Sequence, residues 1–70
     1  MKVLIVVEQT ASGFSAYAPD LPGCIATGES REAVERSMRE VIELHLEGLR
    51  AHGAKLPESH AYATTVEVAA

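Results

Sequence analysis

The chain has 70 residues, a formal net charge of −4 and a single cysteine, Cys24. These totals leave room for one domain over residues 1–70 and exclude an intramolecular disulfide. The acidic charge disfavours direct binding of nucleic acid, which requires a basic surface, and suits a basic protein partner. The apolar run Val3–Val7 is too short for a signal peptide or a membrane span, so we expect a cytoplasmic protein without membrane contact.

The N-terminal half predicts three antiparallel strands in a meander. Val3–Val7 is β-branched and apolar on both faces, which is typical of a central strand. Phe14–Ala18 places Phe14, Ala16 and Ala18 on one face and Ser15 and Tyr17 on the other, and the short turn before it predicts a hairpin with the first strand. Residues 24–27 then predict a short third strand.

The stretch from about residue 31 to residue 52 predicts one long amphipathic helix. Its apolar residues recur at steps of three and four and are Val34, Met38, Val41, Ile42, Leu46 and Leu49. Ser30 is the expected N-cap, and Gly53 is the expected left-handed stop. A helix of this length, about 33 Å at 1.5 Å per residue, is expected to extend past the sheet and meet another molecule.

Residues 61–68 alternate in a period of two and predict a fourth strand. A crossover helix commonly places the following strand parallel to the first, so we expect it beside Val3–Val7. The predicted fold class is therefore α+β in the order β-β-β-α-β, with one long helix on one face. The face that carries Leu4 and Val6 would lie open or be covered by a second copy.

No residue pattern indicates catalysis, a metal or a cofactor. His45 and His52 share a helix face but stand roughly 10 Å apart, too far for one ion, and His45 is expected to be a core or interface histidine. Cys24 is expected to be a small buried hydrophobe. Asp20 is the only aspartate, so the cluster of acids that a magnesium-dependent nuclease needs is missing, and weak nuclease activity is a remote alternative.

The stretch Ala18–Cys24 organises the chain, because two prolines and a glycine within it force a turn between two strands. Asp20 is expected to bond forward to backbone N–H groups of that turn. The candidate site is this turn, first as a structural element and second as a partner contact. Its residues are Pro19, Asp20, Leu21, Pro22 and Gly23.

Residues 14–24 (FSAYAPDLPGC), followed by Thr27–Ser30 and the pair Glu32-Ala33, resemble the signature of the HicB-like antitoxin family. The resemblance covers about residues 1–68 and includes the order β-β-β-α-β. It implies a partial RNase H-like fold that lacks the nuclease carboxylates, in agreement with the lone Asp20.

The resemblance also implies a function. HicB-like proteins bind and inhibit a HicA-type toxin, a small basic enzyme that cleaves mRNA, and they form homo-oligomers such as dimers or tetramers. Many carry a second, DNA-binding domain after this one; the chain stops at Ala70, so we expect no direct DNA binding. The alternative is an orphan homo-oligomer without a toxin partner, acting as a scaffold or binding a small ligand.

Overall fold

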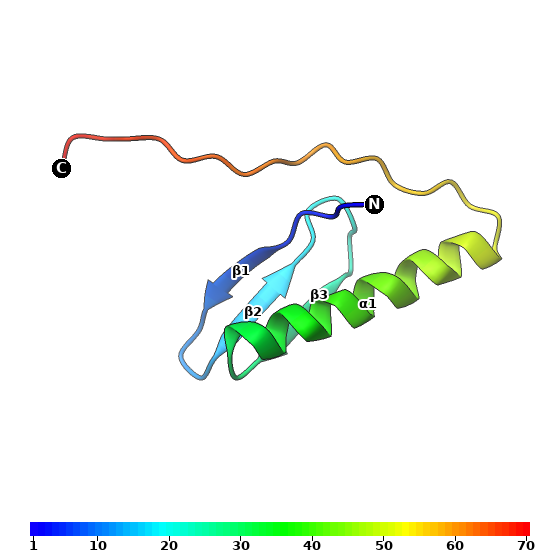
Figure 1. The fold of residues 1–70 in the computed structure, drawn as a ribbon, viewed down its shortest axis with the longest axis horizontal. Helices are drawn as coiled ribbons and strands as arrows, with labels where there is room; N and C mark the ends of the chain where they lie inside the picture. The colour runs from blue at the N-terminus through cyan, green and yellow to red at the C-terminus, as the bar shows by residue number, and fades with distance from the viewer.

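Three strands and one helix make up the regular structure of the computed structural model, which describes all 70 residues. Strands β1 (Val6–Gln9), β2 (Phe14–Tyr17) and β3 (Ile25–Gly28) form one sheet in the order β1-β2-β3, and both pairings are antiparallel. Helix α1 (Arg31–Ala51) lies across one face of this sheet (Figure 1). The α+β class, the meander and the single long helix are as predicted.

Strand β1 begins at Val6 rather than at Val3, and the prediction of its start was wrong. Val6 pairs with Tyr17, the last residue of β2, and the chain turns away at Pro19. Residues 3–5 therefore have no strand opposite them to continue the ladder. Val3 and Ile5 nevertheless pack against the core, so this segment keeps its structural role without pairing.

The predicted alternation along β2 is confirmed. Ala16 and Ala18 are buried beneath α1, whereas Tyr17 points to the other face and is exposed. Strand β3 begins at Ile25 rather than at Cys24, because Cys24 closes the preceding turn: its N–H donates to the Leu21 carbonyl (3.1 Å) and its carbonyl accepts from the Ala18 N–H (3.2 Å).

Both predicted ends of α1 are confirmed. The Ala33 N–H donates to Ser30 Oγ at 3.1 Å, which satisfies one free donor of the first turn. At the other end Gly53 has φ +67°, and the Ala54 N–H donates to the Leu49 carbonyl at 2.9 Å. This is the bond pattern of a helix stopped by a left-handed residue.

The second half of α1 extends beyond the paired strands (Figure 1). Val34 and Met38, in the first half, are fully buried, and Leu46 is buried farther along. His45 is exposed, which excludes the core role and leaves the interface role as a prediction. Past the strands only a narrow stripe of the helix has protein against it, and His45 lies outside that stripe.

Residues 54–70 run back from α1 past the N-terminus as an extended chain without regular secondary structure (Figure 1). The fourth strand predicted over residues 61–68 is not formed within the chain, because no other strand lies beside it to accept a ladder. We call residues 61–70 the C-terminal arm. The arm contributes to an elongated outline of 49 × 27 × 17 Å. The structure contains no helix with both the length and the apolar character to cross a membrane.

Candidate functional site: the Pro19–Gly23 turn and the apolar surfaces around it

The turn between β2 and β3 is closed by its own backbone. The Leu21 N–H donates to the Ala18 carbonyl at 3.1 Å, in addition to the two bonds made by Cys24. Gly23 has φ +91°, a conformation that strains residues with a side chain. Leu21 and Cys24 are each 2% exposed, so the turn is pinned to the core by two side chains while Pro19, Pro22 and Gly23 face solvent.

Asp20 does not bond forward within the turn, and that prediction was wrong. Its Oδ1 accepts from the Ala61 N–H at 3.2 Å, and its Oδ2 lies 3.3 Å from the N–H groups of both His60 and Ala61. Within the turn, Leu21 and Cys24 donate to carbonyl groups and Pro22 has no N–H, so none of these three residues donates to Asp20. The carboxylate therefore fastens the start of the C-terminal arm to the turn.

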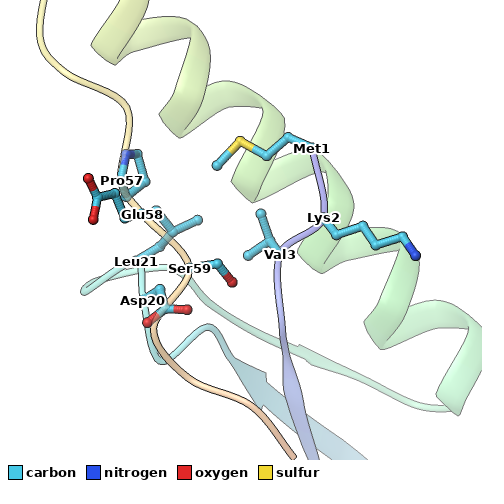
Figure 2. A pocket seen from close by; sticks show the side chains of 8 residues that line it. All are labelled: Met1, Lys2, Val3, Asp20, Leu21, Pro57, Glu58 and Ser59. Atoms are coloured by element: carbon cyan, nitrogen blue, oxygen red, sulfur yellow. The ribbon is translucent and has the colours of Figure 1, made fainter.

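A small hollow beside this contact brings the N-terminal residues close to the segment that follows α1. Figure 2 shows Asp20 and Leu21 next to the segment of Pro57, Glu58 and Ser59, with the N-terminal residues on the other side. The lining residues are Met1, Lys2, Val3, Asp20, Leu21, Pro57, Glu58 and Ser59. The hollow has a cavity volume of about 10 Å³, far below the roughly 300–1,000 Å³ of typical ligand pockets, so it suits chain packing better than a ligand.

A larger groove runs between the N-terminal segment and α1. Its floor is apolar and consists of Met1, Val3, Ile5, Met38, Ile42 and Leu46. Its rim is charged and consists of Glu35, Arg36, Arg39 and Glu43. We call it the N-terminal groove. It lies along residues 1–5, which precede β1, on the side of the sheet that α1 covers, and an apolar floor with a polar rim is the usual anatomy of a protein interface.

The opposite face of the sheet carries an exposed apolar row. Val6 pairs with Tyr17 and Tyr17 pairs with Ile25, so the three side chains stand side by side across the strands. Ile25 is 68% exposed and Tyr17 is 43% exposed. We call these three residues the open-face row. The open sheet face expected from the sequence is therefore present in the single chain.

The remaining candidates for chemistry are dispersed or buried. Cys24 is a free thiol at 2% exposure, and burial raises its pKa, which disfavours the reactive thiolate. No three side chains of His, Cys, Asp or Glu gather closely enough to hold a metal ion. His60 and Lys55 lie near Glu58 at the surface, at 3.6 and 3.7 Å, where ion pairs contribute little.

Two parts of this region were not found from the sequence. The backbone amides of His60 and Ala61 carry no side-chain signal, and only the presence of a lone aspartate in a tight turn hinted at an acceptor. The N-terminal groove depends on how far α1 runs past the strands. Apolar residues at both Val3 and Ile5 were the available hint.

Comparison with known proteins identifies the family to which the chain belongs. The family model described as the HicB-like antitoxin of bacterial toxin–antitoxin systems matches residues 3–69. The chain belongs to the HicB-like antitoxin family.

Individual relatives are small proteins. The chain is 34% identical over 70 residues to a UPF0150 protein of Helicobacter pylori, covering 99% of this chain and 97% of that protein. It is 28% identical over 67 residues to a UPF0150 protein of Thermoplasma acidophilum, covering 94% of this chain and 97% of that one. A 14.9 kDa protein of Haemophilus phage HP1 is 30% identical over 56 residues, which is 80% of this chain but 42% of the phage protein. No solved structure matches the chain significantly.

Proposed function

We propose that this protein is a cytoplasmic antitoxin that binds and inhibits a small, basic, mRNA-cleaving toxin of the HicA type. The observation that carries the proposal is the family match over residues 3–69. The protein acts by covering the toxin and performs no chemistry of its own. Its charge of −4 supports this role, because an acidic protein attracts a basic partner and accelerates their encounter.

The open-face row is the surface we assign to the toxin. Val6, Tyr17 and Ile25 form an apolar centre on the sheet face that α1 leaves uncovered. Glu8 is next but one to Val6 along β1, so it stands on the same face and is exposed. An apolar centre with a carboxylate at its edge matches a toxin that is basic around its active site.

The test is a titration of purified toxin, acting on an mRNA substrate, with the wild-type protein and two variants. Ile25→Lys places a charge in the open-face row and should abolish inhibition. Leu44→Lys makes the same change at a side chain that is 71% exposed on α1 and should leave inhibition intact. Circular dichroism checks that both variants are folded. A toxin that stays active in excess wild-type protein rejects the function, whereas inhibition by Ile25→Lys rejects only the surface.

We also propose that the protein is a homo-oligomer, a dimer or tetramer, with a partial RNase H-like sheet and no direct contact with DNA. Two observations support this: β1 has a strand on only one side, and the arm predicted to be the fourth strand has no partner. If no toxin binds and the oligomer persists, the orphan alternative replaces the antitoxin role.

A further inference from the structure

We propose that the C-terminal arm, residues 61–70, adds as a fourth strand to β1 of a second copy of this chain, parallel to it, and that the exchange is mutual. The proposal rests on the homo-oligomer proposed above and is independent of toxin inhibition. Its basis is an arm and a sheet edge that fit one another and do not meet within the chain.

The arm is left without partners by its own chain. Beyond Ala61, every residue is exposed, and no backbone hydrogen bond joins residues 62–70 to the rest of the protein. Tyr62, Val66 and Val68 are 83%, 84% and 75% exposed. An aromatic and two β-branched residues at alternate positions are suited to a strand with one packed face, and they are poorly suited to remaining in water.

The complementary surface is the free edge of β1. This strand bonds only to β2, so one side of it offers unsatisfied backbone groups to another strand. The N-terminal groove lies beside the segment that leads into this edge, and its floor includes Ile5, the residue before β1, and Ile42 of α1. A strand added to β1 places alternate side chains over this groove, and we assign Val66 and Val68 to it.

Asp20 fixes the point at which the arm begins. It holds the amides of His60 and Ala61 at the β2–β3 turn, and the arm leaves from there past the N-terminus (Figure 1). Nine residues follow Ala61, a reach of about 30 Å at 3.3 Å per residue. An exchange between two copies related by a two-fold axis uses that reach, and it keeps the parallel pairing that the crossover rule predicts for this topology.

The test uses two differently tagged chains in which Cys24 is replaced by alanine. One carries Val66→Cys in the arm and the other carries Ile5→Cys beside β1. After the chains are mixed, unfolded and refolded together, a short bis-maleimide cross-linker is added, and mass spectrometry identifies the products. We expect a product that contains both tags and joins residues 66 and 5. Leu44→Cys, on exposed helix surface, replaces Ile5→Cys in the control and should give at least tenfold less product.

A third chain, with Val66→Cys and Ile5→Cys together, separates the alternatives. A cross-link within one chain at high dilution, without the mixed product, overturns the proposal in favour of an arm folded onto its own sheet. No cross-link in any pair, with the chains folded by circular dichroism, overturns it as well. A mixed product that appears only after the toxin is added assigns the edge to the toxin complex and also overturns the proposal. Toxin inhibition in the absence of the mixed product rejects this inference and leaves the proposed function standing.

Discussion

Asp20 is the side chain on which the course of the last ten residues depends. Its carboxylate accepts from the backbone N–H groups of His60 and Ala61, forty and forty-one positions along the chain. Hydrogen bonds to a charged acceptor contribute about 1.5–3 kcal/mol when sheltered, and partial exposure lowers that figure. No other hydrogen bond joins residues 55–70 to the sheet or the turn.

Replacing Asp20 with alanine should therefore release the arm with little harm to the helix. We expect amide hydrogen exchange at His60 and Ala61 to accelerate by at least tenfold, while exchange at Met38 in α1 stays slow. Asp20→Asn is the matched control, because its amide oxygen still accepts one bond and should give an intermediate rate. Equal exchange rates in the wild-type protein and Asp20→Ala would show that the carboxylate does not hold the arm.

Because of Cys24, we expect the stability of the fold to decrease as the pH rises in the alkaline range. Burial raises the pKa of its thiol above the ordinary value of 9.0, so the folded protein holds this proton more tightly than the unfolded chain does. The contribution is complete below the ordinary thiol pKa and is lost as pH rises from there through the raised pKa of the folded state. We expect the free energy of unfolding to fall across this window in urea titrations, and to fall less in Cys24→Ala. Parallel pH profiles for the two proteins would contradict this.

The Pro19–Gly23 turn shows which features of single residues could be predicted from the sequence. A turn could be predicted from Pro19, Pro22 and Gly23 because the backbone preferences of proline and glycine act locally. Gly23 does adopt a positive φ. The partner of Asp20 could not be found in the same way. A backbone amide forty residues away has no side-chain identity, and only the course of the whole chain brings it within 3.3 Å.

At the scale of elements, the close approach of β3 to α1 fixes the packing of the helix on the sheet. A Cβ at Gly28 would lie 2.6 Å from the Val34 nitrogen and 2.9 Å from the Val34 Cα, both backbone atoms. Val34 is itself fully buried, so it cannot move away without opening the core. Gly28 is needed here for space, because its φ is not in the left-handed region.

Gly28→Ala should consequently destabilise the protein by about 1–3 kcal/mol, the range for overpacking a core. Gly48→Ala is the control, since a Cβ there meets nothing within 4 Å and lies inside α1. In a helix interior that change should stabilise by about 0.5–1 kcal/mol. Thermal unfolding followed by circular dichroism measures both. A Gly28→Ala protein as stable as the wild type would mean that β3 and α1 separate easily.

Helix α1 was predictable nearly to the residue, whereas the strands were displaced. Ser30, Gly53 and the apolar periodicity act within a few residues of one another, so the sequence contains the whole signal. A strand exists only where another strand lies opposite it. The ends of β1 therefore depend on where β2 stops, and the predicted fourth strand depends on an edge strand lying beside it, which residues 61–68 do not have within the chain.

At the scale of the whole molecule, little of the chain is shielded from water. Only seven of the 70 residues are buried, and the apolar groove, the open-face row and the arm all remain exposed. A chain of this size without a disulfide or metal gains limited stability from one core. Because the exposed apolar surfaces lie on both faces of the sheet, the proposed self-association and the proposed toxin binding can use different faces. If both proposals hold, we expect the oligomer to persist when the toxin is bound.

Stability should then depend on protein concentration. For a folded dimer, a hundredfold rise in chain concentration adds about 2.7 kcal/mol to the free energy of unfolding per dimer. Each kcal/mol raises Tm by roughly 2–4 °C for a folding unit about as large as the dimer, so Tm should rise by about 5–10 °C. Differential scanning calorimetry from 5 µM to 500 µM (about a hundredfold range) measures this shift. Val66→Pro removes a backbone donor from the arm, and it should lower Tm and flatten its dependence on concentration. A wild-type Tm that does not change over this range would show that the single copy, with seven buried residues, is stable by itself.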